Sequence, residues 1–331
     1  MKKLKSVIAA LLCAALLLGF AGCSQSDKTA LNISGAEINY ETFLYYLDTV
    51  YAFPEKYGLE KDPTEDELIS TTIELCCEYV AVNTKLEQEQ LILTTAEKRA
   101  ASDSLEDIWH VFSAYYENLG ISKQTLMKIQ TSDAARNRLF YFVFDNGGER
   151  AVNEEDVKKY YNENYISFRA INGYLTTTDE SGNTVVMTAD QKAEMNKEFT
   201  DLESSLNNGQ TMSEVVEKYV AKHPTVTASE QLQFIKKGTG SYPDGFFEEV
   251  SKLKTGACKV IIMDEYIFLV LKDEPEKEES EQYYARYRDD CLKSLHGDEF
   301  DEIVKGYTEG LKVERNDRVI RKALKEVRKD G

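Results

Sequence analysis

The chain has 331 residues, 58 acidic against 40 basic side chains, and a formal net charge of −18 at pH 7. This acidic balance argues against a nucleic-acid-binding protein, because phosphate backbones are bound by basic surfaces. The length exceeds a usual single domain of about 100 to 200 residues, so two modules are expected. Twenty tyrosines and 14 phenylalanines supply the apolar area for a sizeable core and argue against disorder.

The first residues of the chain have the pattern of an export signal. Three lysines within the first five positions precede an apolar run over residues 7–21, which is too short to cross a hydrocarbon core of about 30 Å as a helix. The run ends in Phe20-Ala21-Gly22-Cys23, which resembles the bacterial lipobox, in which the cysteine is acylated and becomes the mature N-terminus. We therefore expect a signal peptide over residues 1–22 and lipidation at Cys23.

Lipidation at Cys23 would decide where the protein works. Two or three acyl chains hold a protein stably on a bilayer, at about 0.8 kcal/mol per buried methylene, so we expect a lipid anchor on the extracytoplasmic face of the cell membrane. The polar segment 23–31 would be the tether between the lipid and the first folded element. A plain secretory signal cleaved at a small residue and an uncleaved anchor are the alternatives.

Helical signals dominate residues 32–150, which we expect to form a helical domain. A short extended segment over 31–38 turns at Ser34-Gly35, and apolar residues at spacings of three, four and seven predict a helix over 40–53. Further helices are expected to begin at Thr64, at Thr94 or Thr95, and at Ser122, and a last one runs over 132–144.

Two tyrosine doublets stand out in this region, Tyr45-Tyr46 and Tyr115-Tyr116. Both members of a doublet cannot face one core, because adjacent helix positions diverge by about 100°. Some of these rings are therefore expected at the surface, where they would suit contact with unfolded chains. The alternative is that they fill the seams between helices.

The character of the sequence changes after Val152. Asn153 is placed to begin a linker helix within residues 151–164. The segments that follow are a strand over 166–175, a turn over 179–183, helices over 190–206 and 212–219, an extended piece over 231–235, a helix over 245–253, and a hairpin of 260–263 with 266–271. This order predicts an α+β domain with a small sheet over residues 165–273.

Three stretches together resemble the SurA-like and PrsA-like foldases. Residues 233–272, with a glycine-bearing turn, a phenylalanine that opens a helix, an LKxG turn and a closing strand pair, resemble a parvulin-type peptidyl-prolyl isomerase domain. NISGAEINYETFLYYL resembles the start of those foldases, and VNEEDVKKYYNENY resembles the linker into their isomerase domain. The resemblance implies an α+β protein in which a helical chaperone-like module carries an inserted parvulin-like domain. Residues 274–331 would be a linker and C-terminal helices that return to the helical module.

The histidines that parvulins use are missing from the matching positions. Rotation of an Xaa-Pro bond faces a barrier of about 20 kcal/mol, which polar groups that favour the twisted amide can lower. The first family histidine falls at Asn172 or Gly173, and the second falls at Ile267. The chain's three histidines lie elsewhere, at His110, His223 and His296. His223 is expected to be solvent-exposed in a loop, and no catalytic residue is assigned.

The apolar half of the family's proline pocket is retained. Leu232, Phe234, Tyr242 and Phe246 match the proline-binding positions, with Tyr242 in place of a methionine, and Asn172 could add a hydrogen bond. The resemblance therefore implies peptide binding at these residues. No phosphate loop, GxGxxG, HExxH or GxSxG pattern is present, so no cofactor or metal is predicted.

Four cysteines remain after the signal and Cys23. We expect Cys76, Cys77, Cys258 and Cys291 to be small buried thiols, because their spacing matches neither a CxxC pair nor a zinc site. A bond between Cys258 and Cys291 is the alternative in an oxidising compartment.

The resemblance favours a membrane-anchored chaperone or foldase that binds unfolded or secreted polypeptides, with a parvulin-like domain that is catalytically impaired. An active peptidyl-prolyl isomerase and a surface lipoprotein that serves as a scaffold are the alternatives, and a homodimer is left open. From Lys312 onward the chain carries eight basic against four acidic residues. A solvated helix is the simpler interpretation of this segment, and contact with anionic lipid headgroups is the other.

Overall fold

The computed structural model describes residues 29–145, 147–224, 226 and 228–329. The described chain divides into two compact units, one made of the residues up to Ala151 together with those from Asp298 onward, the other of Val152–Gly297. The predicted signal peptide, the lipidation at Cys23 and most of the predicted tether lie outside the described residues. Among the described residues, no helix combines the length and the apolar character that crossing a membrane requires.

The first unit begins with a β-hairpin. β1 (Thr29–Ile33) pairs antiparallel with β2 (Ala36–Asn39) across the predicted turn, and β9 (Val313–Arg315), which was not predicted, pairs with the other edge of β1. Gly35 adopts a φ of +97°, a conformation that favours glycine. Because Thr29–Leu31 belongs to β1 and Leu31 is buried, the prediction of a tether that extends to residue 31 is wrong for these three residues.

Four long helices and one short 3-10 helix follow in the first unit: α2 (Tyr40–Ala52), η2 (Pro54–Tyr57), α3 (Glu65–Gln88), α4 (Thr95–Leu119) and α5 (Lys123–Phe144). Side chains of Thr64, Thr94 and Ser122 accept hydrogen bonds from backbone amides of the first turns, as N-caps do. The two helices expected over 122–144 form one continuous helix, because no glycine or proline interrupts the segment.

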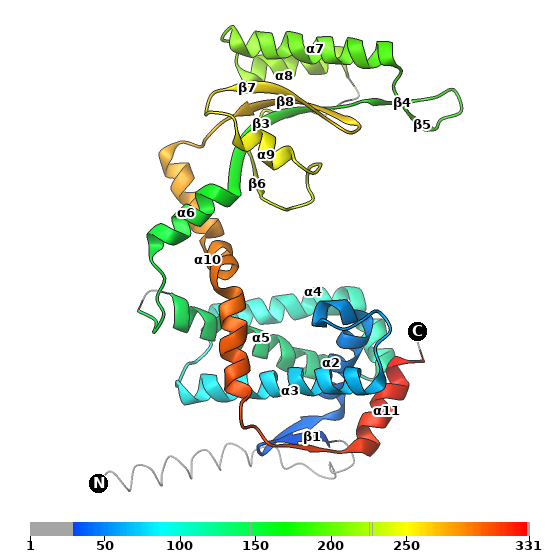
Figure 1. Ribbon diagram of the computed structural model, residues 1–331, viewed down its shortest axis with the longest axis vertical. Helices are drawn as coiled ribbons and strands as arrows, with labels where there is room; N and C mark the ends of the chain where they lie inside the picture. Colours follow the sequence, from blue (N-terminus) through cyan, green and yellow to red (C-terminus); the bar gives the residue numbers. More distant parts are fainter. Residues whose placement is uncertain (1–28, 146, 225, 227, 330–331) are drawn as a thin grey trace. The chain divides into compact units, whose positions relative to one another are not determined.

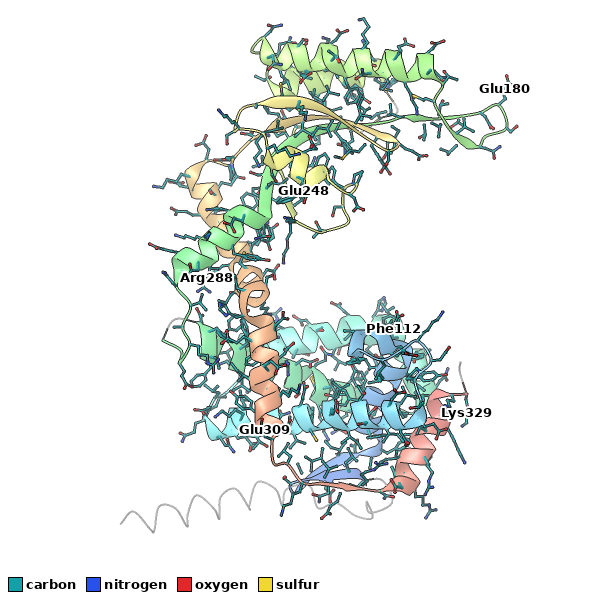
Figure 2. All side chains as sticks on the ribbon, in the orientation of Figure 1. Phe112, Glu180, Glu248, Arg288, Glu309 and Lys329 are labelled. Carbon is teal, nitrogen blue, oxygen red and sulfur yellow. The ribbon has the colours of Figure 1, made fainter. Side chains whose placement is uncertain are left out.

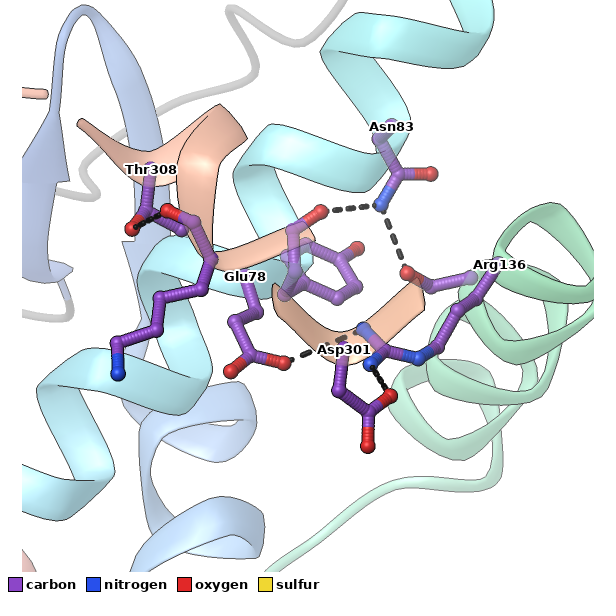
Figure 3. Close-up of polar contacts among 8 residues, drawn as sticks. Glu78, Asn83, Arg136, Asp301 and Thr308 are labelled. Carbon is purple, nitrogen blue, oxygen red and sulfur yellow. Dashed lines mark hydrogen bonds and ion pairs between the residues drawn. The ribbon is translucent and has the colours of Figure 1, made fainter. Parts of the chain in front are cut away.

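The end of a long C-terminal helix belongs to the first unit. α10 (Lys277–Thr308) contributes its residues from Asp298 onward, and Phe300 is buried there with ring centroids 5.3 Å from Phe140 and 6.3 Å from Phe144. Figure 3 shows Arg136 of α5 between two carboxylates: it donates to Glu78 of α3 at 3.2 Å and to Asp301 of α10 at 2.7 Å. This part of α10 is therefore fastened by both apolar and charged contacts.

The last helix, α11 (Asp317–Val327), completes the first unit. Its buried face shares a core with α2: Ile320, Ala323 and Leu324 lie in the same cluster as Phe43 and Leu47. The backbone amide of Asn316 donates to the carbonyl of Ala30 at 2.9 Å, which joins the start of α11 to β1. The expectation of a helical module built from N-terminal helices and a returning C-terminal helix is confirmed (Figure 1).

The second unit is an α+β domain. Its elements are α6 (Glu154–Asn164), β3 (Tyr165–Tyr174), β4 (Thr176–Thr178), β5 (Thr184–Val186), α7 (Ala189–Asn207), α8 (Met212–Lys222), β6 (Gln233–Lys236), α9 (Phe246–Ser251), β7 (Cys258–Met263) and β8 (Tyr266–Lys272), followed by the first part of α10. The predicted order of strands and helices is confirmed. The hairpin of β4 and β5 around the turn at 179–183 is an addition.

The strands β6-β3-β8-β7 form one antiparallel sheet with a helical layer on each face. Successive residues of a strand point to opposite faces, so β3 and β8 supply two separate cores. On one face, Ile171 and Ile267 pack with Phe199 of α7. On the other face, Phe168 and Phe268 pack with Phe246 of α9. Figure 1 shows α7 and α8 on one side of this sheet and α9 on the other.

Candidate functional site

The α9 face of the sheet carries a run of aromatic rings that we call the aromatic row: Tyr174, Tyr266, Phe268, Tyr242 and Phe246. Neighbouring ring centroids in the row are 4.2–5.9 Å apart, and Tyr266 stacks on Phe268 with an interplanar angle of 16°. Tyr174 is 58% exposed and Tyr266 is 37% exposed, whereas Phe246 and Phe268 are buried. The row thus presents exposed rings on a buried aromatic base, which is the kind of surface that binds apolar segments of a peptide.

Two amide side chains lie at the row. Asn172 is directly across from Phe268 in the β3–β8 register, so its exposed side chain shares the face of the row. The hydroxyl of Tyr242 donates a hydrogen bond to Oε1 of Gln233. Burial raises the pKa of Tyr242, while hydrogen bonds with Asn172 and Gln233 oppose that rise. Tyr242 is therefore a neutral phenol at neutral pH, which can donate and accept hydrogen bonds.

The other predicted family positions face away from the row. Gly173 and Ile267 are cross-strand partners, but Ile267 is fully buried in the core under α7. A Cβ at Gly173 would lie 2.7 Å from Cζ of Phe199 and 2.9 Å from Cγ2 of Ile267. The residue that faces the row opposite Asn172 is Phe268, and the match of Ile267 to the second family histidine stays a prediction.

The four predicted peptide-binding residues do not form one surface. Tyr242 and Phe246 are stacked in the row, with centroids 4.2 Å apart at an interplanar angle of 15°, although Phe246 is fully buried. Phe234 pairs with Ser167 on the opposite face of the sheet and stacks on Tyr283 at 3.7 Å. Leu232 is half-buried and precedes β6. Strand alternation therefore turns Phe234 away from the row, and peptide binding at Phe234 stays a prediction.

Sequence reasoning missed the exposed end of the row. Tyr174 and Tyr266 are cross-strand partners at the end of the β3–β8 ladder, and Phe268 follows at the next position on the same face. In the sequence, Tyr266 and Phe268 are two positions apart in β8, and this spacing indicates that their rings share one face of the sheet. Only the pairing register between β3 and β8 reveals which side of the strand they share with Asn172.

No histidine lies in the aromatic row. His110 is exposed on α4, and His296 lies on α10. His223 follows α8, where its Nε2 lies 3.0 Å from Oε2 of Glu198 and its ring is 4.6 Å from that of Tyr219. The expectation that His223 is solvent-exposed is wrong, since its side chain is only 28% exposed.

The cysteines are free thiols in the described chain. Cys76 and Cys291 are buried, while Cys77 and Cys258 are half-buried, so the alternative of a Cys258–Cys291 bond is wrong for this structure. Burial raises the pKa of Cys258, which keeps it a protonated thiol at neutral pH. Within the described residues, no group of three or more histidine, cysteine or carboxylate side chains is placed to hold a metal ion.

A second apolar surface lies on α4 in the first unit, and we call it the α4 stripe: Ile108, Val111, Phe112 and Tyr115. These positions fall on one helix face, and the last three are 68%, 51% and 42% exposed. Leu105 and Leu119, which are buried as Ala101 is, stand seven positions before and after Phe112 and therefore lie on the same broad apolar side of α4. This side of α4 is thus buried toward its two ends and exposed between them, where the stripe lies; Phe112 is labelled in Figure 2.

Only one of the two tyrosine doublets is split between surface and core as predicted. Tyr115 is exposed and donates to Oδ1 of Asp48 at 2.7 Å, whereas Tyr116 is half-buried and stacks near Tyr45 with centroids 6.3 Å apart. Tyr45 and Tyr46 are both half-buried, so the alternative of rings that fill seams holds for that doublet.

Comparison with solved structures finds PrsA/SurA-like foldases and chaperones. The chain is similar to the foldase protein PrsA of Lactococcus lactis, at 11% identity over 91% of this chain and 99% of that one, with a TM-score of 0.40. It is also similar to PrsA of Streptococcus pneumoniae, at 10% identity over 89% and 91%, with a TM-score of 0.38. A SurA-like chaperone of Campylobacter jejuni matches at 11% identity over 87% and 99%, with a TM-score of 0.26. No family model and no curated protein matches the chain.

Proposed function

We propose that this protein is a lipid-anchored extracytoplasmic chaperone that binds unfolded polypeptides, and that its parvulin-like second unit binds proline-containing segments without catalysing their isomerisation. The observation that carries the proposal is the α4 stripe, a run of large apolar side chains that is exposed between the buried ends of the same side of the helix. Scattered exposed apolar residues are ordinary, but a contiguous patch marks an interaction site.

The α4 stripe suits a binder of many sequences. Its side chains are apolar, so any segment that buries methyl groups or rings against them gains binding free energy. The gain is about 25 cal/mol per Å² of apolar area removed from water. The hydroxyl of Tyr115 already has Asp48 as its partner, so binding does not strand a polar group there. Exposed aromatic side chains also lose little conformational entropy when they bind.

The aromatic row would contribute a more selective site. Proline rings pack well on aromatic faces, and the amide of Asn172 can hydrogen-bond a backbone carbonyl of a peptide that lies along the row. Catalysis is a different demand. The amide must be stabilised in its twisted form against a barrier of about 20 kcal/mol, by polar groups fixed around it. The row offers Asn172 and Tyr242 but has Phe268 where a second polar group would stand.

The helical unit is tested by suppression of aggregation. The double variant Val111→Ser with Phe112→Ser should lose most of the ability to keep a denatured client protein in solution, measured by light scattering. Ile92→Ser is the matched control, because Ile92 is 74% exposed in the same unit but lies outside the stripe. Equal activity of the double variant and the parent would contradict the proposed role of the stripe.

The second unit is tested in two assays on the same protein. A proline-containing tetrapeptide should isomerise at the uncatalysed rate, and a proline-containing peptide should bind more weakly to Tyr174→Ser with Tyr266→Ser than to the parent. The control is Val185→Ser with Val186→Ser, which removes exposed apolar residues from the β4–β5 hairpin. A clear rate above background would favour the active isomerase instead.

The lipid anchor is tested in the producing cell. Cys23→Ala should release the protein from the membrane fraction into the medium or periplasm, as immunoblotting of the fractions would detect. A protein that stays in the membrane fraction after this change would contradict acylation as its means of attachment.

A further inference from the structure

The charge of α11 is segregated in a way that the chaperone proposal does not use. Arg318, Lys322, Lys325 and Lys329, the last just after the helix, are three or four positions apart, Arg321 stands four before Lys325, and all five are exposed. The buried residues of the same helix, Val319, Ile320, Ala323, Leu324 and Val327, lie on the opposite side and pack into the core of the first unit. We call the five cations the α11 basic face.

The basic face points into solvent because the opposite side of α11 packs into the core of the first unit. Val319 to Val327 supply the packing, so α11 cannot rotate its cations inward without exposing that core. The carboxylates nearest in sequence are at the flanks: Asp317 lies 3.1 Å from Arg315, and Glu326 lies 2.8 Å from Lys329. No hydrogen bond or ion pair of the Arg318 or Lys325 side chain is found among the described residues.

A basic face is unexpected on this chain. The whole sequence carries a net charge of −18, yet the segment from Lys312 onward has eight basic against four acidic residues. A general need for solubility would be met by either sign of charge, so it does not account for a local reversal. Recognition of an anionic surface does.

The position of α11 relative to the first strand suggests which surface. The amide of Asn316, the N-cap of α11, donates to the carbonyl of Ala30, and the amide of Ser34 donates to the carbonyl of Lys312 at 2.8 Å. Ala30 is seven residues after Cys23. Seven residues can span at most about 25 Å, so an acyl chain on Cys23 would keep the start of α11 within about that distance of the bilayer. This step rests on the proposed lipid anchor.

We propose that the α11 basic face binds anionic phospholipid headgroups. The two attachments would act together: the acyl chains hold the chain at the membrane, and the basic face orients the first unit on it. A lipid anchor and a basic cluster are a common pair of membrane signals, because each lysine or arginine near an anionic surface strengthens binding about fivefold.

The test uses the chain from Ser24 onward, which lacks the lipid but keeps every described residue. Flotation with phosphatidylcholine vesicles that contain phosphatidylglycerol should recover the protein, and vesicles of phosphatidylcholine alone should not. The triple variant Arg318→Gln, Lys322→Gln, Lys325→Gln should bind about 100-fold more weakly. The parent's binding should also fall as salt is raised.

A charge-matched control separates a site from an overall effect of charge. Lys56→Gln, Lys61→Gln, Lys98→Gln removes the same charge from three exposed positions of the first unit outside α11 and should bind like the parent. Circular dichroism and the fluorescence of Trp109 show that both variants are folded. Because the lipid is absent, failure of the Cys23 proposal leaves this result unaffected.

Three outcomes would overturn the inference. One is equal binding of the α11 triple variant and the parent, and another is an equal loss in both triple variants. The third is complete displacement of the parent from vesicles by soluble polyphosphate at a phosphate concentration equal to that of the lipid, which would make a free polyanion the ligand. Weaker competition by polyphosphate supports the assignment to lipid.

Discussion

The α4 stripe and the aromatic row present apolar surface in opposite ways. The stripe is a single helix face with exposed aliphatic and aromatic side chains. The row lies on a sheet, where stacking between neighbours and a hydrogen bond from Tyr242 to Gln233 hold the rings in place. An exposed helix face such as the stripe binds a polypeptide mainly through the apolar area that it buries, so it tolerates many sequences. A surface of rigidly held rings such as the row binds best those segments whose shape fits it. Under the proposed function, these two surfaces would hold a polypeptide in two different ways.

The largest expected effect concerns the base of the row. Phe246→Ala removes a fully buried ring that contacts Phe168, Tyr242 and Phe268, so it should lower the free energy of unfolding of the second unit by about 3–5 kcal/mol. Urea denaturation followed by circular dichroism measures this change. Trp109, the single tryptophan, belongs to the first unit, and its fluorescence transition should move much less.

The matched control for Phe246→Ala is Tyr174→Ala at the exposed end of the row. Tyr174 is 58% exposed, so its removal should cost less than about 1 kcal/mol. Equal losses for the two variants would mean that the row has no buried base and is a surface cluster like the α4 stripe.

Gly173→Ala tests the opposite face of the same strand. Its new Cβ would meet side chains of Phe199 and Ile267 at less than 3.0 Å, so the second unit should lose about 1–3 kcal/mol of unfolding free energy. Gly240→Ala is the control, because nothing lies within 4 Å of a Cβ built there. No change in unfolding free energy for Gly173→Ala would show that Phe199 and Ile267 can move aside for the added methyl group.

Arg136→Gln tests the charged fastening of α10 in the first unit. Burial raises the pKa of Glu78 even with Arg136 beside it, and loss of the guanidinium should raise that pKa further. Both groups are about one-third exposed, so the expected loss at pH 7 is only about 1–2 kcal/mol of unfolding free energy.

The pH dependence of Arg136→Gln has a definite sign. A carboxyl whose folded pKa lies above its unfolded value contributes stability below the unfolded pKa and loses it as the pH rises through the folded pKa. The defect should therefore shrink as the pH falls from 7 toward 4.5, when Glu78 becomes protonated. Urea midpoints of the Trp109 fluorescence at several pH values measure it. Arg99→Gln, an exposed pair with Asp103, should show no such trend.

The smallest expected effect on stability separates binding from folding in the α4 stripe. Phe112→Ser should change the unfolding free energy of the first unit by less than about 1 kcal/mol, because the ring is half exposed. Its effect on client aggregation should still be large. A large loss of stability would mean that Phe112 belongs to the core, which would remove the contrast with the row.

Much of the fold was predictable from local chemistry. The caps at Thr64, Thr94 and Ser122 and the hairpin of β7 with β8 were read correctly, because helix starts and tight turns depend on residues close in sequence. The pairing of β9 with β1 was not predicted, because it joins Leu31 to Arg315, which are nearly the whole chain apart in sequence. Such a contact leaves no mark in a local window of the sequence.

The sequence by itself determined most of the helix starts, the α+β character of the second unit, and the absence of histidine from the positions that resemble the parvulin pattern. Only the tertiary structure decided which side chains meet. It turned Ile267 and Phe234 away from the row and brought Tyr174, Tyr266 and Phe268 into it. The physical reason is the two-residue period of a strand, because a register shift of one position moves every side chain to the other face.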